Sequence, residues 1–446
     1  MDLLEAVFMF GKIGLAFIPL GLIPVMIFLE RKGAAVIQDR PGPNRAAIKV
    51  PILGNIRGFG MVHNFSDVVK LITKEDFIPA KAYKWFYILA PCIPVATAVL
   101  TPAIIPWFAP ITFQGEGVVR EITGSALEAN SGLLLLFAMG ALSVYGVVLG
   151  SWSSNSKYSL LGGLRSSAMM ISYEVSMGLS VLGLILIIGT FNLTEIVQWQ
   201  ENYTWGVFVQ PVGCALFLVS MFAETGRTPF DVAEGESEIV GGFHTEYSSI
   251  KFALFFMGEY AHMVVASALM ATLFFGGWDL FFVPGTGTDF VRANLGFVLA
   301  ALLLGKTLVC GLIWKLIRNQ QARYARFKAS DHESKMKEYG LFSGLFGLIA
   351  LGALGAAIAA AVFIHPEAGP GNTYPLWVQL LTALVQVGIV VTKTLFFCWL
   401  FVWVRWTLPR LRYDQIMGLG WKVLLNIALV NLLITAIVTK LVQEAY

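Results

Sequence analysis

Long apolar stretches recur along almost the whole chain, and they restrict the possible folds more than any other feature. A helix needs roughly 20 predominantly apolar residues to cross a bilayer, and the 446 residues hold about ten such stretches. Charged residues make up only 13% of the chain, whereas a soluble domain carries about 25%. We therefore predict an all-α, polytopic membrane helical bundle that forms one integral domain over residues 1–446. The predicted spans are 7–29, 83–108, 132–151, 167–190, 204–222, 250–277, 293–317, 341–364, 376–404 and 423–443.

Lys and Arg are distributed very unevenly between the segments that join these spans. The loops after odd-numbered spans, together with the adjoining ends of those spans, hold 25 of the 31 Lys and Arg residues. The loops after even-numbered spans hold two. Positive residues gather in the cytoplasmic loops of membrane proteins, so we predict that the odd-numbered loops are cytoplasmic and both termini outside. The net charge of +3 is too balanced to indicate nucleic acid as a partner.

A long loop, residues 30–82, follows the first predicted span on the cytoplasmic side. Asp67, Lys70 and Lys74 form the polar side of a periodic segment within it. This spacing predicts an amphipathic helix, which either lies in the membrane interface as an anchor or covers a cavity. The apolar residues that recur at helical spacing are Met61, Val62, Phe65, Val68, Val69 and Ile72.

A second loop, residues 223–249, concentrates acidic side chains around a single base, Arg227. Charges this dense repel one another, and any that are partly buried should have raised pKa values that allow proton exchange near neutral pH. A solvated acidic loop is the alternative, although apolar residues such as Phe230 and Ile239 would let this loop fold inward. The acids are Glu224, Asp231, Glu234, Glu236, Glu238 and Glu246.

Two carboxylates, Glu174 and Glu259, fall inside predicted spans. Both lie roughly 13 Å below the predicted cytoplasmic edge at about 1.5 Å per residue, so the two side chains could share a polar cavity. An ionisable residue in a span is costly and indicates a functional site; a structural hydrogen-bonded pair is the alternative. Lys393 is also too deep to reach the interface easily, and we expect it to pair with a buried acid.

Cysteine usage gives no indication of a metal centre. Cys92, Cys214, Cys310 and Cys398 lie far apart in apolar segments, which favours buried thiols over zinc or iron–sulfur ligands. We expect no metal and no redox centre in this chain, so that any redox chemistry needs partner subunits. Buried carboxylates below an acidic loop indicate proton translocation or proton-coupled gating.

Five segments also match the patterns of one family. They are ERKGAAVIQDRPGPNR at 30–45, FSDVVKLITKE at 65–75, SKYSLLGGLRSSAMMISYE at 156–174, AETGRTPFDVAEGESEIVGGFHTEYSSIKFALFFMGEYA at 223–261 and VRWTLPRLRYDQIMGLGWKVLL at 404–425. The fourth segment is highly specific. In these segments the sequence resembles the H subunit of NADH:quinone oxidoreductase, the bacterial respiratory complex I.

The resemblance implies that the chain forms most of the membrane side of a quinone chamber, at the junction of the peripheral redox arm and the proton-pumping arm. Asp67 would be a polar residue inside this chamber, and Arg165 the arginine of the loop between the third and fourth spans. The entrance and its cytoplasmic edge would be formed by Arg31, Gln38, Arg40 and the Gly42-Pro43-Asn44 turn.

The acidic residues also receive roles from the resemblance. Glu174 and Glu259 would link an acidic funnel to the rest of the proton pump. The funnel itself would be formed by Glu224, Asp231, Glu234, Glu236 and Glu238. These acids are those already selected on physical grounds.

The same resemblance implies a redox-coupled mechanism shared with partners. Quinone is the expected substrate; it would enter from the bilayer and be reduced by an iron–sulfur cluster of a partner subunit. FMN and the iron–sulfur clusters would all be held by partners, and this chain would bind no cofactor alone. The expected partners are peripheral-arm quinone-site subunits, small membrane subunits and antiporter-like subunits, in a bacterial inner membrane.

The sequence departs from the family pattern at a few positions. His63-Asn64 replaces the Gln-Pro that is common before the chamber helix, and Met169 replaces a frequent Gln. The largest departure is 293–370, which adds two spans to a pattern of eight. We predict that these two helices pack on the periphery and contribute no site residue.

Three alternative functions remain open at this point. A membrane-bound hydrogenase or a ferredoxin- or deazaflavin-linked dehydrogenase would use the same scaffold with another electron donor. A stand-alone proton antiporter is less consistent with the sequence, because inverted repeats are not evident. An inert anchor for a peripheral enzyme would leave Glu174, Glu259 and Lys393 as an unexplained cost.

Overall fold

The computed structural model describes residues 3–40, 42–43, 45–50, 54–115, 118–232, 240–285, 287–324, 330–366 and 374–445. The chain divides into two compact units. Unit 1 comprises Met1–Gly33, Lys70–Gly287 and Gln386–Tyr446, and unit 2 comprises Ala34–Val69 and Thr288–Val385. Three helices run across the unit boundaries: α2 (Ile18–Ile37), α3 (Val62–Thr73) and α16 (Leu376–Thr407).

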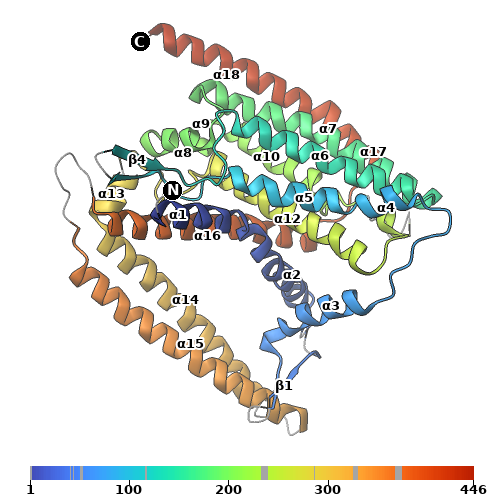
Figure 1. Ribbon diagram of the computed structural model, residues 1–446, viewed down its shortest axis with the longest axis horizontal. Coiled ribbons are helices and arrows are strands. Elements are labelled where there is room, and N and C mark those ends of the chain that lie inside the picture. Colours follow the sequence, from blue (N-terminus) through green and yellow to red (C-terminus); the bar gives the residue numbers. More distant parts are fainter. Residues whose placement is uncertain are drawn as a thin grey trace. The chain divides into compact units, whose positions relative to one another are not determined.

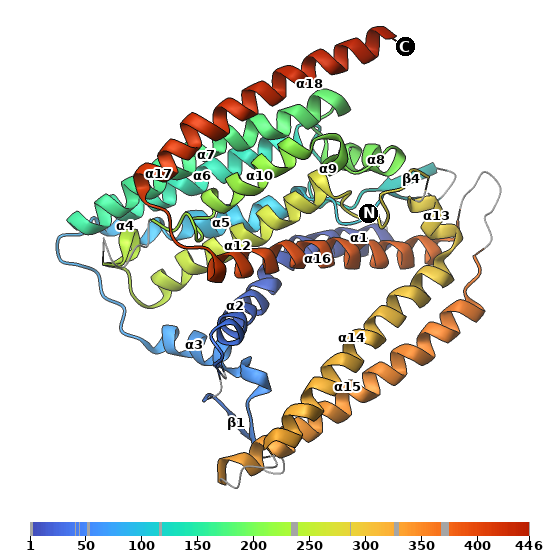
Figure 2. The same cartoon turned by 180° about the vertical axis from the view of Figure 1, so that it is seen from behind.

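Unit 1 is a bundle of long apolar helices built around α7. Helices α6, α10 and α18 pack along α7, and α5 packs against both α6 and α12 (Figures 1 and 2). Its helices are α1 (Leu3–Ala16), α4 (Lys84–Leu89), α5 (Cys92–Leu100), η2 (Thr101–Ile104), α6 (Gly132–Ser153), α7 (Lys157–Ile188), α8 (Leu193–Asn202), α9 (Gly206–Val209), α10 (Pro211–Glu224), η3 (Gly242–His244), α12 (Ser249–Phe274), α17 (Tyr413–Gly418), the π-helical turn η5 (Leu419–Leu424) and α18 (Leu425–Ala445).

Close helix packing in unit 1 depends on glycine at particular positions. A Cβ atom at Gly146 of α6 would lie 2.5 Å from Cδ of Pro94 on α5. A Cβ atom at Gly162 of α7 would lie 2.7 Å from the backbone carbon of Gly242. These helices can approach so closely only because the side chain is absent, as is common between membrane helices.

The predicted polytopic helical bundle is confirmed. Within the described residues, nine helices are long and apolar enough to cross a membrane, and they correspond to nine of the ten predicted spans. The fifth predicted span, 204–222, is instead interrupted at Gln210, between α9 and the 14-residue helix α10. Pro211 starts α10 because its ring favours the first helical position.

The interruption at Gln210 is stabilised by α18. The side-chain amide of Gln210 donates to Thr435 Oγ1 at 2.6 Å, and its oxygen accepts from Asn431 Nδ2 at 3.0 Å. A polar side chain inside a membrane bundle needs such partners, since lipid offers none.

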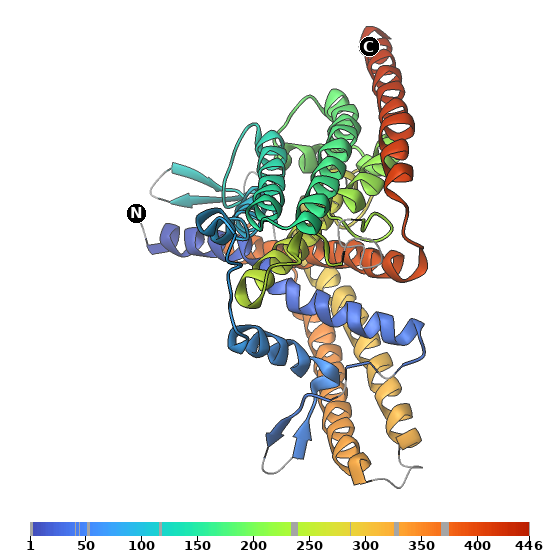
Figure 3. The same cartoon turned by 90° about the vertical axis from the view of Figure 1, so that its right-hand side faces the viewer.

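Two short antiparallel hairpins accompany the helices (Figure 3). In unit 1, β3 (Ile111–Gly115) pairs with β4 (Val118–Ile122), with Ile111 opposite Ile122. In unit 2, β1 (Ile48–Val50) pairs with β2 (Gly54–Ile56), with Ile48 opposite Ile56. Both hairpins lie in segments that were predicted to be loops.

Unit 2 contains the two long helices of the segment 293–370. Helices α14 (Leu295–Tyr324) and α15 (Ser330–Phe363) lie side by side along their length (Figure 1). The short helix α13 (Thr288–Ala293) precedes them, and the turn η1 (Gly58–Gly60) leads into α3. The predicted amphipathic helix is confirmed as α3, where Phe65, Val68 and Ile72 are exposed.

Candidate functional site

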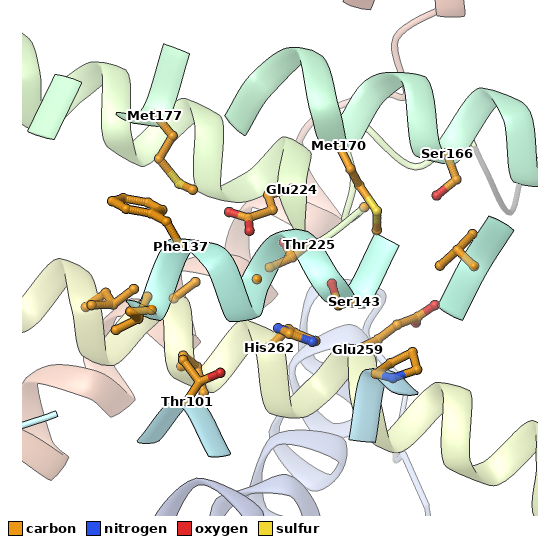
Figure 4. A pocket seen from close by; sticks show the side chains of 18 of the residues that line it. Thr101, Phe137, Ser143, Ser166, Met170, Met177, Glu224, Thr225, Glu259 and His262 are labelled. Atoms are coloured by element: carbon orange, nitrogen blue, oxygen red, sulfur yellow. The ribbon is translucent and has the colours of Figure 1, made fainter. Parts of the chain in front are cut away.

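A cavity of about 70 Å³ lies inside unit 1, between α5, α6, α7, α10 and α12 (Figure 4). Three ionisable side chains line it: Glu224, Glu259 and His262. Apolar side chains such as Phe137, Phe217 and Leu269 form much of the remaining lining. Hydroxyl groups and methionines also contribute, including Thr101, Ser143, Ser166, Thr225, Met170 and Met177. We call this space the carboxylate cavity. It combines proton-binding groups with polar side chains that can relay a proton.

Glu224 is the last residue of α10 and lies against the backbone of α6. A Cβ atom at Gly140 would be 3.3 Å from Glu224 Oε1, so the absence of a side chain at Gly140 leaves room for the carboxylate. Glu174, half-buried on α7, lies near enough to Glu224 for their charges to interact. Three of the acids selected from the sequence, Glu174, Glu224 and Glu259, are therefore near or in one polar region.

Glu259 connects the cavity to a cluster of buried charges. Its Oε2 atom lies 3.8 Å from Nη2 of Arg227, and the Arg227 guanidinium stacks 4.3 Å from the centroid of the Tyr260 ring. The side chain of Arg227 is only 7% exposed. A guanidinium held in this way fixes the position of the carboxylate beside it.

Glu30 of α2 is the second acid of this cluster. It accepts hydrogen bonds from the Tyr260 hydroxyl and from Arg405 of α16, and its Oε2 atom lies 4.0 Å from Nη1 of Arg227. We refer to Glu30, Arg227, Glu259, Tyr260 and Arg405 as the charge cluster. Two acids and two arginines balance there, which offsets the large cost of removing charges from water.

Glu30 and Arg405 were not among the predicted site residues. Both lie near the predicted end of a span, where charged residues usually reach the interface. One signal was available: Arg227 is the single base among the acids of 223–249, and a buried base needs acidic partners.

Asp231 lies apart from the carboxylate cavity. Its Oδ2 atom accepts from Nη2 of Arg410 at 2.9 Å, and Asp231 is buried. The backbone N–H of Leu411 donates to the carbonyl of Pro229 at 2.9 Å, so the turn that carries Asp231 is attached to the segment before α17. The other predicted funnel acids, Glu234, Glu236 and Glu238, lie outside the described residues.

His262 faces α5 from one turn beyond Glu259. Its Nε2 atom lies 3.3 Å from the Thr97 hydroxyl oxygen, and Thr97 is itself buried. His262 lines the cavity together with Glu224 and Glu259, as Figure 4 shows.

The residues assigned to a quinone chamber are distributed over both units. In unit 1, Arg31 is exposed on α2, and Arg165 of α7 lies over the Tyr413 ring at 5.7 Å. In unit 2, the side chains of Gln38 and Arg40 bond to one another, and Asp67 is half-buried on α3. Asn44 of the predicted turn lies outside the described residues.

Lys393 binds backbone carbonyls. Its ammonium donates to the carbonyl oxygens of Phe275, Gly277 and Asp279 at 2.6, 3.0 and 2.5 Å, and it lies 4.4 Å from the centroid of the Trp205 ring. The positive φ angles of Gly276 and Gly277 belong to this tight turn.

The acid expected beside Lys393 is Asp279. Its carboxylate accepts from Trp205 Nε1 at 2.9 Å and interacts with the ammonium charge. Burial raises the pKa of Asp279 to about 6, although the Trp205 hydrogen bond and the Lys393 charge lower it.

The described part of the chain contains no group of three or more His, Cys, Asp or Glu residues placed to hold a metal ion. In the same part of the chain, four cysteines are free, and Cys214, Cys310 and Cys398 are buried. The ionisable side chains of the carboxylate cavity and the charge cluster can bind and release protons.

Comparison with known proteins agrees with this architecture. The sequence matches a family described as NADH dehydrogenase over residues 12–349 and 335–436. It is 39% identical over 417 residues to NADH-quinone oxidoreductase subunit 8 of Rhodothermus marinus, covering 93% of this chain and 91% of the relative.

Two further relatives are named as H subunits of NADH-quinone oxidoreductase. H subunit 2 of Geobacter sulfurreducens is 37% identical over 426 residues, covering 95% of this chain and 94% of the relative. H subunit 1 of Cytophaga hutchinsonii is 35% identical over 408 residues, covering 92% and 89%. Identity at this level over almost the full length, in a polytopic helical bundle, shows that this chain belongs to the NADH dehydrogenase family as a membrane subunit of NADH-quinone oxidoreductase, of the same type as these H subunits.

Proposed function

We propose that this chain forms the membrane side of a quinone chamber and couples quinone reduction to proton translocation through its buried carboxylates. The single observation that supports coupling is the continuity of ionisable groups in unit 1. The charge cluster begins at Glu30, and Glu259 belongs both to it and to the carboxylate cavity, which Glu224 and His262 also line.

Glu259 links the charge cluster to the carboxylate cavity, because it belongs to both. If Glu259 takes up a proton, Arg227 loses the negative charge that lies 3.8 Å away, while Glu30 stays 4.0 Å from it. A change of charge at either end of the cluster therefore alters the proton affinity at the other end, because the ion pairs share one guanidinium. A cavity of about 70 Å³ also exceeds the roughly 10–15 Å³ that one water needs, which supports a short proton relay.

The chamber would be formed by Arg31, Gln38, Arg40, Asp67 and Arg165 together with peripheral-arm partners. Helix α3 supports this assignment because it presents an apolar face beside polar residues such as Asp67, and a quinone has both an apolar tail and polar carbonyls. Quinone would be reduced by a partner's iron–sulfur cluster, and antiporter-like subunits would receive the proton signal.

The proposed location is a bacterial inner membrane with both termini on the outer side. The uneven distribution of Lys and Arg between alternate loops supports this orientation. Partner subunits would then dock on the cytoplasmic side, where loops 30–82 and 223–249 lie in this arrangement.

The coupling proposal is tested by Glu224→Gln and Glu259→Gln in the complete complex, reconstituted in vesicles. Quinone reduction and proton uptake are measured together, with Glu75→Gln as the control because Glu75 is exposed. We expect the number of protons moved per NADH to fall in both cavity variants and to stay constant in the control. An unchanged ratio in both cavity variants would refute the carboxylate route.

A further inference from the structure

The turn before the amphipathic helix is held by a carboxylate of α15. Glu338 Oε1 accepts the backbone N–H groups of Arg57 at 2.9 Å and of Gly58 at 2.7 Å. Glu338 is 8% exposed. Hydrogen bonds from backbone amides to a charged carboxylate are among the stronger ones in proteins, so this contact fixes two successive peptide groups of one turn.

Aromatic packing supports the same contact. The Phe59 ring lies 4.8 Å from the ring of Phe342 and 5.7 Å from that of Tyr339, measured between centroids. Phe59 has φ of +56°, between Gly58 at +57° and Gly60 at +108°. A left-handed conformation is unfavourable for a residue with a bulky side chain, so the turn depends on its surroundings for this shape.

The turn determines where α3 begins and where the preceding segment lies. Gly60 packs so closely on Pro43 that a Cβ atom would be 2.6 Å from the Pro43 carbonyl oxygen. From the first turn of α3, His63 Nε2 accepts the backbone N–H groups of Arg45 and Ala46, each at 3.0 Å. A displacement of the turn would therefore move α3 and also Pro43, Arg45 and Ala46.

We propose that Glu338 is a positioning residue for the quinone chamber: α15 holds the turn at 57–60 and thereby places α3 together with Pro43, Arg45 and Ala46 for quinone binding. This inference rests on the proposed function, because α3 carries Asp67. It gives α15 a role, whereas the helices of 293–370 were expected to contribute no site residue. The interaction needs an oxygen acceptor of the right shape, and the amide of glutamine provides one.

The experiment compares Glu338→Ala, Glu338→Gln and Leu345→Ala in the purified complete complex. Leu345 is an exposed residue of α15 and controls for general disturbance of that helix. Three quantities are measured: hydrogen exchange at the amides of residues 54–61, KM and kcat for a short-chain quinone, and NADH oxidation with a hydrophilic electron acceptor. The last quantity reports whether the peripheral arm is intact.

We expect Glu338→Ala to accelerate amide exchange by about tenfold or more, since roughly 1.4 kcal/mol corresponds to tenfold and two charged hydrogen bonds are lost. The KM for quinone should rise severalfold while kcat and the hydrophilic acceptor activity change little. Glu338→Gln should restore both exchange and KM, and Leu345→Ala should leave both unchanged.

Two results would overturn the proposal. Unchanged exchange in Glu338→Ala would show that the hydrogen bonds do not hold the turn, and accelerated exchange with an unchanged KM would show that the turn does not position the chamber. Labelling of the wild-type complex with a photoreactive quinone tests independently whether the quinone chamber is formed by these residues. If no label is found within residues 31–67, the proposed chamber itself is wrong, whatever the exchange data show.

Discussion

Replacing Glu30 by glutamine should destabilise the helical bundle of unit 1 strongly. The substitution keeps the shape of the side chain but removes the acid that bonds to Arg405 and Tyr260 and lies 4.0 Å from Arg227. Two arginines would then share the charge cluster with only one remaining acid, Glu259.

The magnitude follows from the burial of these side chains. Glu30 is 11% exposed, Arg227 7% and Arg405 25%. Removing one partner of a buried ion pair costs about 3–5 kcal/mol. We expect the lower limit, about 3 kcal/mol, because Arg227 keeps Glu259 at 3.8 Å and Arg405 retains some contact with solvent. Because roughly 1.4 kcal/mol changes an equilibrium constant tenfold, this loss increases the fraction of molecules in which the bundle is open by about two orders of magnitude.

A buried thiol on α16 provides the assay. Cys398 is buried and Cys92 is exposed, so a membrane-permeant maleimide reaches Cys398 only when the bundle opens. Peptide mass spectrometry of the labelled complex gives both rates for this chain alone. Cys398 should react about a hundredfold faster in Glu30→Gln, while Cys92 should react at the wild-type rate.

Glu75→Gln is the matched control, since it neutralises an exposed carboxylate. It should leave the labelling rate of Cys398 unchanged. If Cys398 reacts less than about threefold faster in Glu30→Gln than in this control, the charge cluster does not stabilise the bundle, and the argument from burial is refuted.

Three further predictions follow from local contacts. Lys393→Met removes three hydrogen bonds to carbonyls and should cost about 2–4 kcal/mol, measured as a lower midpoint of thermal unfolding. Since the folded-state pKa of Asp279 is raised to about 6, its contribution to stability is full below about pH 4 and is lost as the pH rises through 6. Stability should therefore fall by about 3 kcal/mol over this range, and Asp279→Asn should remove this dependence from the thermal midpoint. Gly162→Ala forces a Cβ atom to 2.7 Å from the Gly242 backbone and should cost about 1–3 kcal/mol in the same assay. Gly178→Ala on the same helix, where nothing lies within 4 Å, should cost nothing.

Most of the helical architecture could be predicted because bilayer thickness fixes the length of an apolar helix. The interruption at Gln210 could not be found from hydrophobicity, since residues on both sides of it are apolar. Pro211 was the available signal, because proline at the first position of a helix marks a start rather than an interior. The division into two units involves contacts between distant segments, and no local pattern reports these.

The candidate site could be predicted where a single ionisable residue falls inside a membrane span, because its burial there costs free energy. Glu174 and Glu259 were selected because a carboxylate inside a span needs a reason, and the structure gives Glu259 a cavity and an arginine. Glu30 and Arg405 were missed because their meeting depends on the fold: 375 positions separate them in the sequence. A charge at the end of a span indicates nothing until its partner is known.

The turn around Lys393 resembles a binding site for a monovalent cation. The cation here is the Lys393 ammonium group, which is covalently attached to the chain. Three carbonyl oxygens and an aromatic face surround the ammonium, as such groups surround a bound metal ion. A tethered ion cannot diffuse away, and its effective concentration is set by the backbone rather than by the medium. The shape of the loop at 275–279 should accordingly be the same whether sodium or potassium is the dominant salt in the medium.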